Sequence, residues 1–426
     1  MPVELISLPH EVNEVVLEYL EPADILSLRL TSKHLATANF DWFQKWCMVR
    51  RIHLWTRHGL QSLIDITDPD RNLLQRLEHI SFAVQTVRQP PVKRASSGAS
   101  YNGSNALLHY NRLGRWKCWE QEKVPDDETG LSGLMTIFNN IRLAQNKQRA
   151  RRSITVRITA RPIDPNLDQE QVATMLNPLG WPYGTRTLLD RIGHEMVAGN
   201  LAYGNSEPVC DSLVRAINTS GCSIRCLDIE KSYYTGLQKP QAFQTLRDGN
   251  SVCWEALTSF NLTLSPPRVV RSARERAACL NGLAAFMRAT KNLERLKIYE
   301  PLLLPASLDK FQQFRARDIW AGIPYAAMPL RLKHIELRNT AAPERAYTML
   351  LWYQRSSIRS LEMVQAVQSE GIGWYGLFTV LLEASNLEEL ELKSLSPGHD
   401  SIANIAKTGR DVIKEALQRA IANATE

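Results

Sequence analysis

One pattern decides the fold of this chain, and its two tightest copies read Ser357-Ile358-Arg359-Ser360-Leu361-Glu362-Met363 and Ser385-Asn386-Leu387-Glu388-Glu389-Leu390-Glu391-Leu392. In each copy, an apolar residue is followed by a second one three positions later and by a third one two positions after that, as in Ile358, Leu361 and Met363. Four earlier segments share this spacing: Ile224-Leu227-Ile229, Leu257-Phe260-Leu262, Leu293-Leu296-Ile298 and Leu332-Ile335-Leu337. The alternation at the end of each copy predicts a short strand with one apolar face.

The residues before each copy read as helix, and residues 271–290 are one example, with an apolar stripe that includes Leu283 and Phe286. A strand–helix unit that recurs several times is typical of a solenoid, in which each unit is stabilised by its neighbours. The intervals between copies are irregular, and no asparagine or cysteine follows consistently at the usual position. We therefore predict an α/β fold, namely an irregular leucine-rich-repeat-like α/β solenoid.

The array extends toward the N-terminus. Leu77-Ile80-Phe82 shows the same spacing after a helical stretch at residues 54–66, and Ile154-Val156-Ile158 alternates after a helical stretch at residues 133–150. Residues 88–105 lie between these two segments and are rich in Pro, Ser and Gly, which predicts a mobile surface loop. We expect a second insertion at residues 162–205.

These patterns divide the chain into five parts. We expect an N-terminal helical domain at residues 1–47 and connecting helices with a possible first repeat at residues 48–88. A flexible loop insertion at residues 89–130 then precedes the repeat domain at residues 131–400. The last part is a C-terminal helix within residues 401–426, expected to span residues 401–424 and to close the array.

The N-terminal segment has the spacing of three short helices. Val12, Val15, Val16, Tyr19 and Leu20 form one apolar stripe. The segment Glu21-Pro22-Ala23-Asp24 ends this helix and starts a second one that carries Ile25, Leu26, Leu28 and Leu30. Thr31-Ser32 supplies the cap of a third. So small a unit cannot bury all these apolar groups internally, which indicates a protein-binding surface.

Three of these stretches carry a family resemblance: Leu8-Pro9-His10-Glu11-Val12, Tyr19-Leu20-Glu21-Pro22-Ala23-Asp24-Ile25-Leu26 and Leu28-Arg29-Leu30-Thr31-Ser32-Lys33, followed by Trp42. In this order and spacing they resemble an F-box, and the whole chain resembles fungal F-box proteins with poorly matching repeats. The resemblance implies docking onto a Skp-type adaptor, which in turn binds a cullin. The implied adaptor-binding residues are Leu8, Pro9, Ile25 and Leu26, with Leu28 near the edge of the interface. His10 departs from the family, where an acidic residue or proline is common.

Composition and charge narrow the class of protein. The net charge of +7 is a modest excess for 426 residues, and part of it lies in the basic run at residues 147–152. That run is either a nucleic-acid contact or the solvated end of a helix. The seven cysteines show no metal-ligand spacing, and no long apolar segment or leader is evident. We expect an intracellular protein without membrane spans, disulfides, metal or cofactor.

Catalytic motifs are absent or incomplete. Gly371-Ile372-Gly373-Trp374-Tyr375-Gly376 matches the dinucleotide-binding pattern, but the loop before its first glycine is long and two aromatic residues occupy it. His194-Glu195 begins a zinc-protease motif, but Ala198 stands where the second histidine is needed. The chain has no Gly-x-Ser-x-Gly elbow and no phosphate loop. We therefore expect no catalytic residues.

These observations favour a substrate-recognition subunit of a Skp–cullin–F-box ubiquitin ligase, with client contacts on the strand-lined face and near Tyr233-Tyr234 and Trp374-Tyr375. Core packing is the alternative for these aromatic residues. Two other functions stay open: an F-box scaffold outside any ligase, and a nucleic-acid-associated protein that uses residues 147–152.

Overall fold

The structure, a computed structural model, describes residues 12, 15–17, 19–20, 22–43, 50–71, 74, 77–87, 127–147, 153–159, 201–203, 206–229, 251–263, 282–300, 320, 322–368, 374–395 and 405–425. These residues form a mixed α/β fold around one sheet of ten strands in the order β1-β2-β4-β6-β7-β8-β9-β11-β13-β14. The order follows the chain. All pairs are parallel except the last, β13 with β14.

The predicted strands are confirmed. The six copies form β6 (Ile224–Ile229), β7 (Ser259–Thr263), β8 (Arg295–Tyr299), β9 (His334–Arg338), β11 (Ser360–Val364) and β13 (Glu389–Lys393). The two earlier segments form β2 (His79–Ala83) and β4 (Ile154–Thr159). The apolar spacing therefore predicted eight of the ten strands in the sheet.

From β6 to β13, neighbouring strands pair in a constant register. Ile335 lies opposite Leu296 on one side and Leu361 on the other, and Leu361 lies opposite Leu390. Equivalent apolar residues of successive copies therefore form continuous rows across the sheet. Because side chains alternate between the two faces of a strand, the residues between them also form rows, on the opposite face.

The turn after each of the last three copies also repeats. Asn339, Gln365 and Ser394 each follow the final residue of a strand and have φ values of 54°, 53° and 54°. The backbone N–H groups of Asn339 and Gln365 each donate to the last carbonyl of the next strand, at Val364 and Lys393, over 2.8 Å. A left-handed residue other than glycine is uncommon, so its recurrence at one position shows that these units share a turn as well as a strand.

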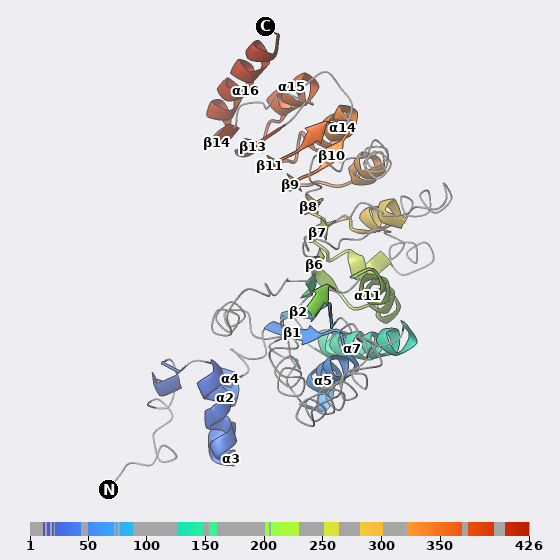
Figure 1. Cartoon of the computed structure of the whole chain (residues 1–426), viewed down its shortest axis with the longest axis vertical. Helices are drawn as coiled ribbons and strands as arrows, with labels where there is room; N and C mark the ends of the chain where they lie inside the picture. The colour runs from blue at the N-terminus through green and yellow to red at the C-terminus, as the bar shows by residue number, and fades with distance from the viewer. Residues whose placement is uncertain are drawn as a thin grey trace, which may run out of the picture.

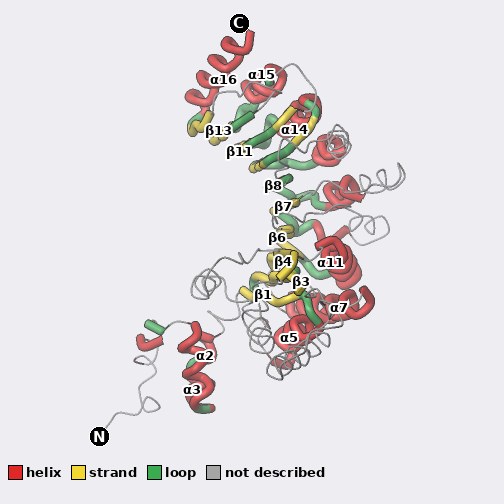
Figure 2. Tube along the Cα trace, in the orientation of Figure 1, coloured by secondary structure: helices red, strands yellow, loops and turns green. Residues whose placement is uncertain are grey.

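Helices cover one face of the sheet, as Figures 1 and 2 show for α5, α7, α11 and α14. Their apolar side chains meet the apolar rows of the strands; Phe286, for example, packs against Trp254 and Phe260 at 4.9 Å between ring centroids. The helices here are α5 (Arg57–Thr67), α7 (Asp127–Lys147), α11 (Ser206–Ser220), α14 (Glu344–Gln354), α15 (Tyr375–Glu383) and α16 (Arg410–Thr425), with helical residues at 282–289 and 322–327 and 3-10 turns η3 (Pro69–Arg71) and η7 (Ser251–Trp254).

Two strands of the main sheet differ from the prediction. β1 (Arg50–Leu54) was not expected, because two arginines and a histidine mask its alternation, yet His53 is fully buried. The C-terminal helix begins at Arg410, so its prediction from residue 401 is wrong over β14 (Ile405–Thr408). Ile405 is buried against the sheet, and Gly409 with φ of 89° separates strand from helix.

The remaining elements are small. β3 (Gln85–Val87) pairs with β5 (Leu201–Tyr203), and β10 (Ala341–Ala342) pairs with β12 (Val367–Gln368). Residues 127–130 of the expected loop insertion belong to α7, while residues 89–126, and 162–200 of the second insertion, lie outside the described part of the chain.

Candidate partner-binding sites

The N-terminal helices form the first candidate site. Their best described member is α2 (Pro22–Thr31), which begins with proline, carries Asp24 in its first turn and Arg29 in its last. Proline suits the first helical position, and these charges complement the helix dipole. The expected third helix is divided into α3 (Lys33–Ala38) and α4 (Phe40–Phe43). In Figure 1 these three helices lie near the N-terminus, at the end of the molecule opposite α16.

Arg29 holds the three helices together. Its guanidinium donates to the carbonyl of Ala36 in α3 and lies over the ring of Phe43 at 4.2 Å from the centroid. The Ser32 hydroxyl accepts from the N–H of Leu35 over 3.2 Å and so caps α3, as its position before the helix predicts. The Leu-Arg-Leu-Thr-Ser stretch therefore builds a junction between helices.

Three of the five residues in the apolar stripe of the first helical segment face solvent, while Val16 and Leu20 are half-buried. Val12, Val15 and Tyr19 are 45%, 53% and 85% exposed, whereas Leu17, which the stripe omits, is buried. Leu30 at the end of α2 is 88% exposed. Large apolar side chains exposed to this extent in so small a unit mark a protein-binding surface.

The adaptor-binding residues predicted from the resemblance are only partly described. Leu28 in α2 is half-buried, and its carbonyl accepts from the Thr31 hydroxyl over 2.7 Å. Ile25 and Leu26 belong to the same helix, but their side chains are outside the described part, as are Leu8 and Pro9 altogether. The assignment of these five residues to a binding site stays a prediction. Leu30 and Tyr19 were noted only as apolar positions, and their exposure adds them to the candidates.

The second candidate site is the face of the sheet opposite the helices. Cross-strand pairing places a row of seven polar residues in register on this face, which we call the polar ladder: Arg157, Asp228, Asn261, Lys297, Glu336, Glu362 and Glu391. Each of its members lies between two apolar residues of the buried rows. The register therefore brings together charges that are far apart in the sequence.

The first strands of the polar ladder have balanced charges. Asp228 is buried, and its carboxylate accepts from Arg157 over 2.7 Å and from the Asn261 amide over 2.7 Å. Each oxygen of the carboxylate thus has a donor, which offsets much of the cost of burying it. The end with Arg157 is therefore a satisfied structural network.

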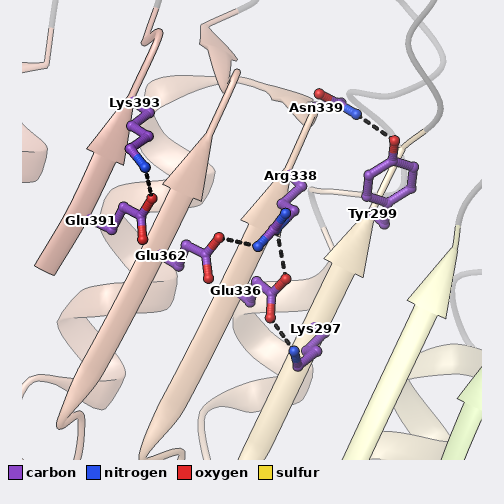
Figure 3. Close-up of polar contacts among 8 residues, drawn as sticks. All are labelled: Lys297, Tyr299, Glu336, Arg338, Asn339, Glu362, Glu391 and Lys393. Atoms are coloured by element: carbon purple, nitrogen blue, oxygen red, sulfur yellow. Dashed lines mark hydrogen bonds and ion pairs between the residues drawn. The ribbon is translucent and has the colours of Figure 1, made fainter. Parts of the chain in front are cut away.

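The last strands carry three glutamates side by side. Figure 3 shows Lys297 and Arg338 paired with Glu336, Arg338 also paired with Glu362, and Lys393 paired with Glu391. Like charges opposite each other on adjacent strands repel. The effect appears in Glu362, where burial first and then the carboxylates of Glu336 and Glu391 raise the pKa of its carboxyl, while Arg338 lowers it.

A separate cluster, with half-buried Glu300 and buried Trp320, lies where β8 ends. The carboxylate of Glu300 accepts from the indole N–H of Trp320 over 2.9 Å and from the backbone N–H of Ala341 over 3.2 Å. Desolvation raises the pKa of the Glu300 carboxyl to about 7 despite these two donors. Beside it, the Asn339 amide donates to the hydroxyl of Tyr299 over 2.7 Å. The cluster joins neighbouring turns.

The dinucleotide-binding motif is occupied by the protein itself. A carboxylate oxygen of Glu344 accepts from the N–H of Gly376 over 3.2 Å at the start of α15, where a pyrophosphate would have to bind. A Cβ on Gly376 would come within 2.7 Å of this oxygen, so a larger residue there would displace the end of the flexible Glu344 side chain. Trp374 is 1% exposed, so its predicted role as an exposed contact is wrong and core packing applies. Tyr375 is exposed.

Other predicted contacts and motifs receive little support. Lys147 is the last residue of α7, as expected for a helix end, whereas residues 148–152, Tyr233-Tyr234 and His194-Glu195 lie outside the described part. Among the residues that the structure describes, no three His, Cys, Asp or Glu side chains are grouped to hold a metal ion. Among the described residues, Cys222 and Cys253 form no disulfide, and burial raises the pKa of both thiols, that of Cys253 to about 12.

The described helices include none that is long and apolar enough to cross a lipid bilayer.

Comparison with known proteins agrees with the N-terminal geometry. Residues 5–38 match the F-box domain family, which covers the exposed helix stripe, α2 and α3. A comparison with curated proteins yields no match for the chain. The rest of the chain is thus characterised by its structure alone, as a large parallel sheet with helices on one face. The chain therefore carries an F-box domain at residues 5–38.

Proposed function

We propose that this chain is a substrate-recognition subunit of a Skp–cullin–F-box ubiquitin ligase. The F-box match at residues 5–38 carries the proposal, because F-box domains generally bind Skp-type adaptors. The solvent-facing apolar groups on the matched helices support it, since they supply an unfilled surface of the right kind. The protein then acts inside the cell and without catalytic residues of its own.

The adaptor interface in this proposal comprises Leu8, Pro9, Ile25, Leu26 and Leu28, with the cullin bound through the adaptor. Tyr19 and Leu30 extend it, because both are exposed on the same small helical unit. Arg29 does not contact the adaptor in this view; its bond to α3 keeps the surface in shape.

We further propose that residues 131–400 form a leucine-rich-repeat-like solenoid that binds the client on its polar, strand-lined face. Constant register, strands in chain order and a repeated left-handed turn support this description. The mechanism is proximity. Holding a client at a fixed distance from the ubiquitin-charged enzyme raises the effective concentration of its lysines, and no acid, base or nucleophile is needed.

Affinity purification tests the proposal. The intact protein is compared with a variant that combines Leu8→Ala and Pro9→Ala, which should weaken adaptor binding by about 3 kcal/mol, roughly a hundredfold. Proteins that disappear with the variant form the ligase core, and those retained are candidate clients. Unchanged recovery of the adaptor would refute the proposed interface.

A ubiquitylation assay separates ligase from scaffold. If the adaptor co-purifies but a cullin and client ubiquitylation do not follow, the protein is a scaffold outside a ligase. If RNA or DNA is retained and lost on neutralising Arg149, Arg151 and Arg152, the nucleic-acid function replaces both.

A further inference from the structure

Two neighbouring helices of the C-terminal part are aligned by contacts at both ends. One comprises the helical residues 322–327, and the other is α14. Near their N-terminal ends, the rings of Trp320 and Tyr347 pack at 5.3 Å between centroids. At their C-terminal ends, the amide of Gln354 donates to the carbonyl of Ala327 over 2.8 Å. The members of each contact are 27 residues apart in sequence, so residues with this separation lie at the same height on the two helices.

The solvent-facing side of these helices carries large apolar side chains. Tyr325 and Trp352 are again 27 residues apart, and they are 55% and 43% exposed. Met328, three positions after Tyr325, is 56% exposed. Met349 and Tyr353 lie beside Trp352 on its helix and are half-buried. We call these five residues the outer apolar patch. Aromatic residues and methionine are enriched in protein interfaces, so the patch is a candidate docking surface.

Three arginines surround the outer apolar patch. Arg331 follows Met328 by three positions, and Arg345 lies two helical turns before Trp352 on the same side of α14. The guanidinium of Arg355 lies over the Trp352 ring at 4.0 Å from the centroid and donates to the Trp352 carbonyl over 2.7 Å. Within the part of the chain that the structure describes, none of these three arginines forms an ion pair with a carboxylate. The patch therefore has a cationic margin.

The acidic residues of the two helices leave this margin positive. Residues 320–331 contain no Asp or Glu, and α14 contains only Glu344. The carboxylate of Glu344 accepts from the N–H of Gly376, at the end of α14 remote from Trp352. An apolar centre with a cationic margin is complementary to an apolar face that is bordered by carboxylates.

The spacing of the two aromatic residues fits a helix as the occupant. Packed helices lie about 8–10 Å apart, so Tyr325 and Trp352 are separated by about this distance across the two helices. In an α-helix, residues i and i+7 lie on one face and about 10.5 Å apart. A helix that crosses both helices can therefore contact Tyr325 with one of these residues and Trp352 with the other.

We propose that the outer apolar patch docks an amphipathic helix of another protein, with apolar residues at i, i+3 and i+7 and with Asp or Glu beside them. The apolar residues contact Tyr325 and Trp352, and the carboxylates pair with the surrounding arginines. The patch lies on the helix-covered side, far from α2 and opposite the strand-lined face (Figure 1). The proposal therefore goes beyond the proposed function and adds a third binding surface.

The first test is a peptide array probed with the full-length protein. Its peptides of about 18 residues form about five helical turns and carry Leu, Phe or Ser at the apolar positions and Asp, Lys or Gln beside them. We expect selection of Leu or Phe at i, i+3 and i+7, together with Asp. Selection of Lys or Gln beside the apolar positions would overturn the inference, as would equal binding of the peptides with Ser.

The second test measures the affinity of the selected peptide by fluorescence anisotropy. Tyr325→Ala combined with Trp352→Ala should weaken binding about fiftyfold, because both aromatic anchors are lost. The matched control combines Leu143→Ala and Val412→Ala, which remove side chains that are 50% and 47% exposed on α7 and α16. The control should bind like the wild type. An equal loss in the control, or no loss in the first variant, would overturn the inference.

The third test addresses the cationic margin and does not depend on the stability of the aromatic variant. Arg331→Gln combined with Arg345→Gln should weaken binding about tenfold and make the remaining affinity less dependent on salt. Arg225→Gln combined with Arg295→Gln removes the same charge from exposed positions on β6 and β8 and should leave the affinity unchanged. Equal affinities of these two variants would overturn the inference.

Adaptor binding is measured on the same proteins and should be the same in all of them. If peptide selection fails while the adaptor still binds, only this inference fails. If the adaptor does not bind, the proposed function fails separately.

Discussion

Replacing Leu30 by alanine tests the adaptor surface where the structure describes it. The side chain is 88% exposed, so nearly all of it is available to a partner and little of it stabilises the fold. The substitution removes three carbons, and at about 0.8 kcal/mol for each buried group the loss of adaptor affinity is about 2.4 kcal/mol, roughly fiftyfold. The free energy of unfolding should change by no more than about 0.5 kcal/mol.

Calorimetric titration of the full-length variant with a purified Skp-type adaptor measures the first quantity, and chemical denaturation measures the second. Leu143→Ala is the matched control, because Leu143 is 50% exposed on α7, which belongs to the sheet domain. It should leave adaptor affinity unchanged. If Leu30→Ala binds the adaptor as tightly as the wild type, Leu30 lies outside the interface and the reasoning from exposure is refuted.

Three further predictions concern the sheet domain. Trp374→Ala should lower the unfolding free energy by about 3–5 kcal/mol and Tyr375→Ala by less than about 0.5, as measured by urea denaturation, because only Trp374 is buried; equal effects would contradict this. Burial raises the pKa of Glu300 to about 7 from an ordinary 4.5. The contribution of protonated Glu300 to the unfolding free energy is therefore fully present below pH 4.5 and is lost as the pH rises through about 7. The melting temperature of Glu300→Gln should therefore depend less on pH than that of the wild type. Identical pH profiles of the two proteins would contradict this role of Glu300. Arg157→Ala should lower the unfolding free energy by about 1.5–3 kcal/mol, because the buried Asp228 loses a charged donor. In the same denaturation assay, the double variant with Asp228→Asn should recover part of this loss.

The strands were predictable because their signal is local. Three apolar residues within six positions define a strand and its buried face, and this held even for the early copy around Ile80. β1 was missed because a polar residue, His53, occupies a buried position in it, and hydropathy counts histidine as polar. β14 was missed because Ile405 alone anchors it, and one apolar residue carries no period.

The candidate sites were less predictable. The apolar stripe of the first helix was predicted at five positions, but Tyr19 and Leu20 lie in the turn after the helix. Leu17, which the stripe omits, is the buried residue, because the tertiary contacts decide which face is covered. The glutamates of the polar ladder are ordinary solvent-facing residues when each strand is considered alone. Their proximity depends on the register of strands that lie 26 and 29 residues apart in sequence, from Glu336 to Glu362 and from there to Glu391.

Direct binding of the purified full-length chain to a purified Skp-type adaptor tests the central claim. Size-exclusion chromatography with light scattering should give one chain per adaptor at about 10 μM, since a specific interface of ordinary size supports submicromolar affinity. The complex should be lost when Leu8→Ala and Pro9→Ala are combined. Separate elution of the two wild-type proteins at this concentration would contradict the account.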